Sequence, residues 1–287
     1  MAHSWRKLLL GDFTLKRCIR SFLFIYTCFA LYVYLFSDSM IFLPPDSSYE
    51  DSPEILKLLT PDQESISAIY LPHPDAKYTL LYIHGNAEDL GDIRPLLDQL
   101  QTLNFNIFAY DYRGYGTSEG RPSERNAYID IETAYQYLRE VLNTPAEKII
   151  LFGRSVGGGS ALHLAVQEPV GGIILESTFT QAFRVVVPFP LLPFDKFRNL
   201  DKIKRVSAPV LIIHGTADQT IPIAHGKRLF EAAPEPKLAF WVEGATHNDV
   251  PWVDWEAYQN KLKEFVDLLE SERNSLYLER DLSPSSR

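Results

Sequence analysis

The chain has 287 residues, 46% of them apolar, and a formal net charge of −9. This length suits one large α/β domain with a well-buried core. No basic cluster occurs in the C-terminal three quarters, which excludes the electrostatic footprint of a nucleic-acid-binding protein. Both cysteines, Cys18 and Cys28, lie near the N-terminus, so a disulfide framework, a cysteine nucleophile and a thiolate metal site are excluded from the rest of the chain.

The N-terminal segment contains an apolar run at residues 19–36 that predicts a membrane-spanning helix. At ~1.5 Å per residue, a helical run of this length covers about 27 Å, close to the hydrocarbon thickness of a bilayer. A basic flank at 1–18 precedes the run, and only acidic charges follow it until Lys57. This asymmetry predicts a single-pass anchor with its N-terminus in the cytoplasm and the rest of the chain across the membrane. A cleaved signal peptide, and a helix lying on the membrane surface or packed on the domain, remain alternatives.

A linker rich in proline, serine and acidic residues is predicted at 37–53, a folded domain at 54–270 and a polar tail at 271–287. Within the domain, strands alternate with helices, which is typical of a mostly parallel sheet with helices on both faces. The predicted strands are 66–71, 79–83, 106–110, 148–152, 172–175, 210–214 and 237–242. The predicted helices are 89–103, 123–142, 155–167, 222–232 and 252–270.

A loop of small and polar residues follows strand 79–83, early in this domain. That loop reads His84-Gly85-Asn86-Ala87-Glu88. Backbone N–H groups in such a loop can be preorganised donors to an anion. We expect the Asn86 amide to be one of them, with Ala87 as the fallback, and His84 to brace the loop.

The segment Gly153-Arg154-Ser155-Val156-Gly157 fits the G-x-S-x-G motif, with an apolar strand before it and a helix after it. In that setting a sharp turn lifts the serine hydroxyl above the sheet and aims the helix N-terminus at it. We therefore interpret Ser155 as a nucleophile. The amides of Val156 and Asn86 would be the two N–H donors that a tetrahedral oxyanion needs. A glycine-rich turn that binds nothing is the alternative.

A serine hydroxyl is a poor nucleophile unless a base takes its proton, and in this fold the acid and then the histidine follow the serine. Of the seven histidines, His247 fits best, in a loop just after the last strand. Three of the others precede Ser155, and two lie within helical segments. His214 ends a strand, where packing beneath the site is expected.

The acid should follow the strand at 210–214, and the turn after that strand contains Asp218. Its role would be to hold the imidazole tautomer and stabilise the imidazolium. Asp218 could instead only cap that turn, and Asp201 and Asp249 are weaker alternatives. The chemistry needs no metal and no organic cofactor.

Five motifs, which occur in the same order along the chain, are given at the end of this paragraph. Together they resemble the bud-emergence (Bem-like) branch of the α/β-hydrolases, which includes the α/β-hydrolase domain-containing proteins of types thirteen and seventeen. The resemblance runs from about residue 40 to 270 and implies an eight-stranded, mostly parallel sheet and the triad of Ser155, Asp218 and His247. An N-terminal membrane anchor is also common in the branch. The motifs are His84-Gly85-Asn86-Ala87, Asp111-Tyr112-Arg113-Gly114-Tyr115-Gly116, Gly153-Arg154-Ser155-Val156-Gly157-Gly158, His214-Gly215-Thr216-Ala217-Asp218 and Gly244-Ala245-Thr246-His247-Asn248.

Residues 178–206 are rich in phenylalanine, valine and proline and stand where a cap over the site is usual. An apolar cap suits an acyl or other hydrophobic group, although packing onto the domain or the membrane would use the same residues. We therefore expect a membrane-anchored serine hydrolase that cleaves a small acyl ester, a thioester or a lipid-like substrate. A serine peptidase of the same fold and a non-catalytic, membrane-tethered binding protein remain alternatives.

The stretch 111–116 is interpreted as structural support near the site, and none of its residues is expected to be a fourth catalytic residue.

Overall fold

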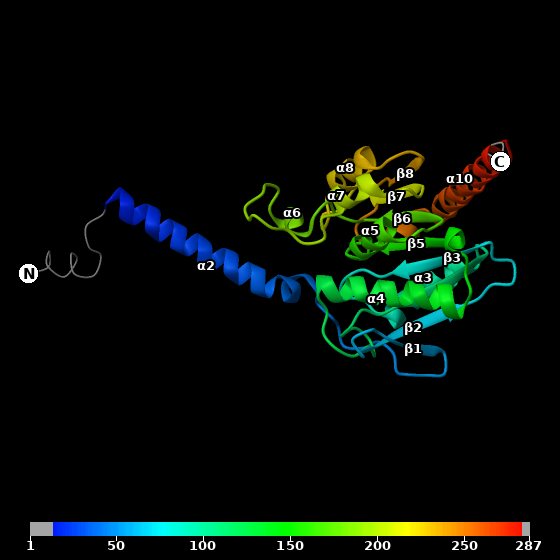
Figure 1. Ribbon diagram of the computed structural model, residues 1–287, viewed down its shortest axis with the longest axis horizontal. Helices are drawn as coiled ribbons and strands as arrows, with labels where there is room; N and C mark the ends of the chain where they lie inside the picture. Colours follow the sequence, from blue (N-terminus) through cyan, green and yellow to red (C-terminus); the bar gives the residue numbers. More distant parts are fainter. Residues whose placement is uncertain (1–13, 283–287) are drawn as a thin grey trace, which may run out of the picture. The chain divides into compact units, whose positions relative to one another are not determined.

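The computed structural model describes residues 14–282, with side chains to residue 275, and divides into two compact units, Met1–Ile41 and Phe42–Arg287. In the first unit lies helix α2, Leu15–Ile41, which contains the whole apolar run at 19–36 (Figure 1). Within the described part of the chain, α2 is the one helix long and apolar enough to cross a membrane. Its large apolar side chains, such as Phe22 and Phe24, are exposed.

The second unit is built on an eight-stranded sheet in the order β1-β2-β4-β3-β5-β6-β7-β8. In Figure 1 the sheet extends from β1 at one edge to β8 at the other. Strands β1, β2 and β4 pair antiparallel, and all other neighbours from β4 to β8 pair parallel. This is the mostly parallel sheet that the family resemblance implied, so the predicted fold class is confirmed. The strands are β1 Ile55–Leu59, β2 Ser65–Leu71, β3 Tyr78–Ile83, β4 Phe105–Tyr110, β5 Ile149–Arg154, β6 Gly172–Glu176, β7 Val210–Gly215 and β8 Lys237–Val242.

Helices cover both faces of this sheet. Helices α3 and α10 share one buried apolar cluster with the strands, in which Leu97 and Phe265 are fully buried. On the other face, α4 packs on α5, α5 on α7, and α7 on α8. The helical segments are α3 Leu90–Gln101, α4 Glu124–Gln136, η1 Tyr137–Val141, η2 Ala146–Lys148, α5 Gly157–Gln167, α6 Ala182–Val186, α7 Asn199–Lys202, η3 Ile203–Arg205, α8 Ala224–Ala232, α9 Val250–Val253 and α10 Trp255–Leu282.

Strand β1 and helices α4 and α10 differ from the sequence prediction. Strand β1 was not predicted, because it is a short edge strand in which only Leu58 is buried, so its sequence shows no clear alternation. The helix expected to run to residue 142 is α-helical to Gln136 and continues as a wider π-helical turn, η1, to Val141. Helix α10 continues to Leu282, beyond the predicted end at residue 270.

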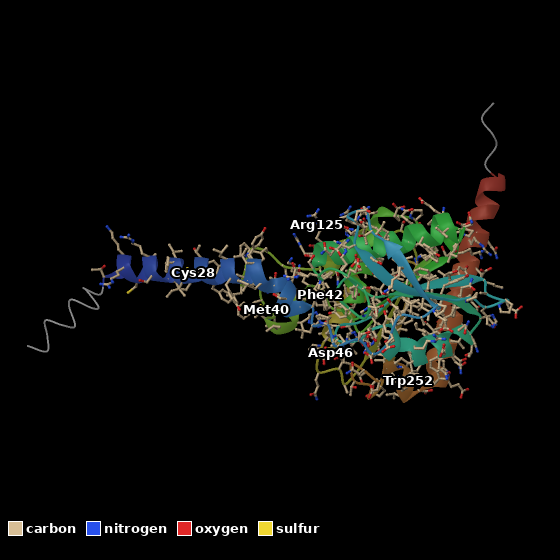
Figure 2. The ribbon with its side chains drawn as sticks, turned by 90° about the horizontal axis from the view of Figure 1, so that it is seen from below. Cys28, Met40, Phe42, Asp46, Arg125 and Trp252 are labelled. Carbon is tan, nitrogen blue, oxygen red and sulfur yellow. The ribbon has the colours of Figure 1, made fainter. Side chains whose placement is uncertain are left out.

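The chain between α2 and β1 is ordered along the second unit. Helix α2 takes up residues 37–41 of the expected linker, and Phe42, the next residue, is 2% exposed. In Figure 2, Met40 marks the end of α2, and Phe42 and Asp46 mark the segment that follows. This segment belongs to the same compact unit as the sheet.

Candidate active site

The sharp turn between β5 and α5 holds Ser155. Its backbone φ is +52°, in the left-handed region that side chains rarely adopt, and the serine is 7% exposed. The turn is fixed by a hydrogen bond from the Ser155 amide to the Glu176 carbonyl (2.8 Å) and by one from the Thr178 hydroxyl to the Ser155 carbonyl (2.6 Å). A Cβ at Gly157 would overlap the carbonyl of Ile83, so only glycine lets the turn lie against the end of β3.

Three side chains predicted from the sequence lie together at the carboxyl edge of the sheet. The Ser155 Oγ is 3.1 Å from Nε2 of His247, and Nδ1 of His247 is 2.8 Å from Oδ2 of Asp218. They come from the segments after β5, β8 and β7, and parallel strands place such segments at one edge. The arrangement allows the hydroxyl to donate to the imidazole and the imidazole to donate to the carboxylate.

Asp218 is held as an ionised acceptor. Its Oδ1 accepts hydrogen bonds from the amides of Thr220 (2.9 Å) and Ile221 (2.8 Å). Burial by itself would raise the pKa of Asp218, but hydrogen bonds to His214, His247 and the Ile221 amide lower that pKa overall. The carboxylate therefore stays charged and available to orient the imidazole.

His214 lies beneath this carboxylate, as its sequence position suggested. It is fully buried, and its Nε2 is 2.7 Å from the Ile221 carbonyl and 3.4 Å from Oδ2 of Asp218. A carbonyl can only accept, so Nε2 carries the proton and can share it with the carboxylate. His214 therefore supports the turn that contains Asp218.

The two other candidate acids lie in other surroundings. Asp201 pairs with Arg198 at 2.7 Å, and Asp249 accepts a hydrogen bond from the Thr246 amide at 2.6 Å. Among the residues that the structure describes, Asp218 is the carboxylate hydrogen-bonded to His247.

The loop after β3 lies beside the Ser155 turn. A Cβ at Gly157 would also meet the His84 carbonyl, so the first turn of α5 and the start of the loop are in close contact. Ala87 adopts a φ of +57°, and the Asn86 side-chain oxygen accepts hydrogen bonds from the Tyr115 hydroxyl (2.6 Å) and the Ala87 amide (3.0 Å). The amides of Asn86 and Val156, one in each segment, remain the predicted oxyanion donors.

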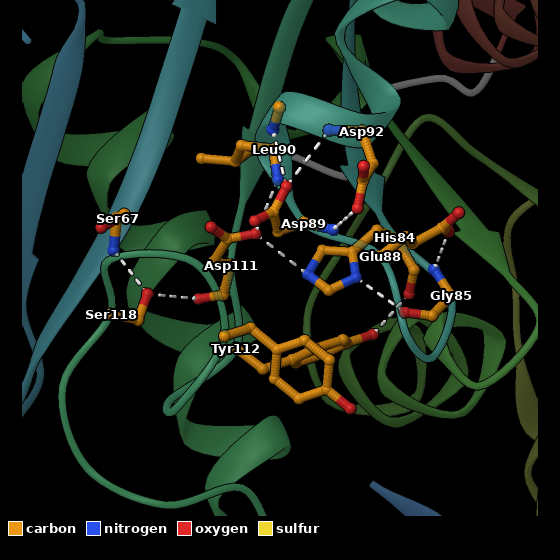
Figure 3. Close-up of polar contacts among 12 residues, drawn as sticks. Ser67, His84, Gly85, Glu88, Asp89, Leu90, Asp92, Asp111, Tyr112 and Ser118 are labelled. Carbon is orange, nitrogen blue, oxygen red and sulfur yellow. Dashed lines mark hydrogen bonds and ion pairs between the residues drawn. The ribbon is translucent and has the colours of Figure 1, made fainter. Parts of the chain in front are cut away.

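His84 and Asp111 form a buried pair under this loop (Figure 3). Nδ1 of His84 donates to the Gly85 carbonyl at 2.7 Å, and Nε2 faces Oδ1 of Asp111 at 3.3 Å. Burial by itself would lower the pKa of His84, but Asp111 raises it overall, which favours an imidazolium–carboxylate pair. Asp111 also accepts from the Leu90 amide, and the Tyr112 hydroxyl donates to the His84 carbonyl. These contacts brace the loop.

Sequence reasoning missed the part played by Arg154, the residue before Ser155. Its guanidinium donates to Glu88 Oε1 (2.6 Å), to the His247 carbonyl (3.1 Å) and to the Asn248 side chain (2.8 Å). Its Nε also lies 3.6 Å from Oε1 of the fully buried Glu176. Arg154 therefore links the Ser155 turn, the 84–88 loop and the His247 loop. The one signal in the sequence was a charged residue at the end of an otherwise apolar strand.

The segment at 178–206 follows β6, and an ion pair joins two residues within it. Arg184 Nε lies 3.0 Å from Asp195 Oδ2, and the Phe183 amide donates to the other oxygen of Asp195. Between them Val186 is 83% exposed and Phe189 59% exposed. The segment thus presents apolar side chains to its surroundings.

Known proteins similar to this chain share its fold and family. The model of the alpha/beta hydrolase fold matches residues 78–205. The human alpha/beta hydrolase domain-containing protein 17B is 45% identical over 196 residues, 67% of each chain, and the Caenorhabditis elegans protein aho-3 is 41% identical over 200 residues, 69% of this chain and 60% of that one. A solved esterase of Pyrococcus furiosus matches with a TM-score of 0.66 at 18% identity, over 78% of this chain and 98% of its own, a likeness that shows the fold alone. The resemblance to the type-seventeen proteins is confirmed.

Proposed function

The chain belongs to the α/β-hydrolase superfamily, among the α/β-hydrolase domain-containing proteins, and on that premise we propose that it is a serine hydrolase that cleaves carboxylic esters or thioesters. The observation that carries the proposal is the chain of hydrogen bonds from Ser155 through His247 to Asp218, at 3.1 and 2.8 Å. Nucleophile, base and orienting acid within hydrogen-bond reach are what acyl transfer to serine requires.

In the proposed mechanism, Ser155 Oγ attacks the acyl carbon while His247 Nε2 takes the hydroxyl proton. The ionised Asp218 stabilises the imidazolium, and the amides of Asn86 and Val156 donate to the oxyanion. His247 then gives its proton to the departing alcohol or thiol, which leaves an acyl-serine. Water, deprotonated by His247, hydrolyses that ester, releases the carboxylic acid and restores the Ser155 hydroxyl.

We assign an apolar acyl group to the substrate because of the segment at 178–206. This segment has two exposed apolar side chains, Val186 and Phe189, and a half-buried one, Phe183. Contact with an acyl chain would remove apolar surface of these side chains from water, which is favourable.

Helix α2 is proposed as the membrane anchor. Its 27 residues exceed the about 20 that a bilayer requires, and its apolar side chains are exposed. The charges that flank the run at 19–36 favour an orientation with the N-terminus in the cytoplasm and the domain with Ser155 on the other side.

A substrate panel with a Ser155→Ala control tests the proposed function. Purified full-length protein is assayed with p-nitrophenyl esters, acyl-thioesters and aminoacyl amides. We expect turnover of esters or thioesters that the Ser155→Ala variant lacks. Turnover of the amides alone would identify a peptidase instead, and no turnover of any substrate would favour a binding protein.

A further inference from the structure

The segment that joins α2 to the sheet contacts the loop after β3, which carries the predicted oxyanion donor Asn86. We call residues 42–49 the strap. Its first residue, Phe42, is 2% exposed and meets three aromatic rings edge-on. The ring centroids of Tyr112, Phe197 and Tyr115 lie 5.9, 5.9 and 6.4 Å from that of Phe42. This packing fixes where the chain enters the second unit.

The next residue of the strap bonds directly to Asn86. The Leu43 amide lies 2.9 Å from the Asn86 side-chain oxygen and 3.0 Å from the Tyr115 hydroxyl, which itself donates to the same oxygen at 2.6 Å. The side chain of Asn86 is thus fixed from two directions. Because a fixed side chain restricts the backbone that carries it, the direction of the Asn86 amide depends on these bonds.

The other end of the strap reaches the same loop by a second route. The Tyr49 hydroxyl donates to Oδ2 of Asp111 at 2.5 Å, and Oδ1 of Asp111 faces His84, which donates to the Gly85 carbonyl. The Asp111, His84 and Gly85 part of this route is visible in Figure 3. Burial raises the pKa of Tyr49, so the phenol remains a neutral donor at ordinary pH.

The last contacts bind the strap to the start of α3. The Ser48 amide donates to Oδ2 of Asp89 at 2.7 Å, and the Ser48 hydroxyl also donates to this carboxylate. Asp89 caps α3 by accepting from the amides of Gly91 and Asp92. A Cβ at Gly91 would overlap the Ser48 hydroxyl, so the strap lies directly against the helix. The strap therefore bonds to the 84–88 loop at Asn86, reaches His84 through Asp111, and bonds to Asp89 directly after the loop.

We propose that the strap is a positioning element of the active site, which holds the 84–88 loop so that the Asn86 amide points at the developing oxyanion. The proposal rests on the proposed function. Oxyanion stabilisation depends on donors that are already in place before the reaction, so a loosened loop lowers kcat more than it raises KM.

The test removes a single amide hydrogen from the strap of the full-length protein. Leu43→Pro deletes one of the donors to the Asn86 side-chain oxygen, and since the Leu43 side chain is 56% exposed, little packing is lost. Asp46→Pro is the matched control, because Asp46 makes none of the contacts that hold the 84–88 loop: it is exposed and, among the residues described, its amide has no hydrogen bond. The two substitutions are matched because each introduces one proline next to the Pro44-Pro45 pair, Leu43→Pro before it and Asp46→Pro after it.

We expect Leu43→Pro to lower kcat about tenfold, less than the ~10²–10³-fold loss from deleting an oxyanion donor outright. KM and the pH profile should stay within twofold of wild type, since Ser155 and His247 are untouched. A trifluoromethyl ketone, which forms an oxyanion on serine, should lose affinity by the same factor as kcat. Asp46→Pro should match the wild-type protein. Tyr115→Phe, which removes the second donor to Asn86, should act in the same direction as Leu43→Pro.

The outcomes separate this proposal from the proposed function. If Leu43→Pro and Tyr115→Phe both turn over substrate like Asp46→Pro, the strap does not position the loop. The proposal also fails if their losses lie in KM or in melting temperature and the ketone affinity is unchanged. A Ser155→Ala protein that hydrolyses the same ester at the wild-type rate would instead refute the proposed function.

Discussion

Replacing Arg154 by methionine perturbs the point where three loops of the site meet. Methionine keeps most of the aliphatic length but removes a guanidinium that is 8% exposed and contacts Glu88, Glu176 and the His247 carbonyl. Breaking a buried ion pair on one side costs about 3–5 kcal/mol, because the remaining charge is left without compensation. For a domain of this size, that loss corresponds to a fall in melting temperature of roughly 6–20 °C.

The same change should depend on pH. Burial raises the pKa of Glu176 even beside Arg154, and removing the arginine takes away the nearest cation that favours the ionised form. A carboxyl whose folded-state pKa is raised favours the fold at low pH and loses that contribution as pH rises through the folded-state pKa. The destabilisation by Arg154→Met should therefore be larger at pH 8 than at pH 5.

The assay is thermal unfolding of wild type and variant in one detergent at both pH values, together with kcat. Because the guanidinium fixes the His247 carbonyl, we expect kcat to fall by up to about 10²-fold, the cost of small misplacements in an active site. Arg94→Met is the matched control, because Arg94 pairs with Glu54 and Asp98 at the surface and should cost under ~1 kcal/mol. An Arg154→Met protein as stable as Arg94→Met, or a penalty that is the same at both pH values, would refute this reasoning.

Two further predictions concern the acid and the anchor. Asp218→Asn should lower kcat about 10⁴-fold through the wrong imidazole tautomer while KM changes little; steady-state kinetics measure this, and a larger loss in Asp201→Asn would contradict the assignment. The protein should resist carbonate extraction from membranes, because α2 is long and apolar enough to span them, and protease added to sealed vesicles should reach the catalytic domain only from the non-cytoplasmic side. Full release by carbonate would contradict a spanning anchor, and cleavage from the cytoplasmic side would contradict the orientation.

The parts of the fold that sequence reasoning anticipated are those encoded by neighbouring residues. Strand β5, the turn at Ser155 and helix α5 follow from an apolar run, a G-x-S-x-G motif and small residues, all adjacent in the chain. The positions of Asp218 and His247 followed from chain order, since parallel strands bring their following loops to one edge of the sheet. Strand β1 was not predicted, because an edge strand with one buried residue shows little alternation of apolar and polar residues.

The contacts that could not be predicted join residues far apart in the sequence. Arg154 and Glu88 are 66 residues apart, and Leu43 and Asn86 are 43 apart. Neither pair has a local signature: a serine- and proline-rich stretch such as 42–49 has the composition of a linker. Its role becomes visible only when the buried ring of Phe42 and the Leu43 amide are placed against their partners.

The central claim is that Ser155 is a nucleophile activated by His247 and Asp218, and labelling by a fluorophosphonate tests it most directly. The probe phosphonylates an activated serine, and mass spectrometry of the digested protein identifies the modified residue. We expect the adduct on Ser155 in wild type, much slower labelling in Asp218→Asn, and none in a folded Ser155→Ala protein. Labelling of a folded Ser155→Ala protein at the wild-type rate, or a wild-type adduct on another residue, would contradict the account.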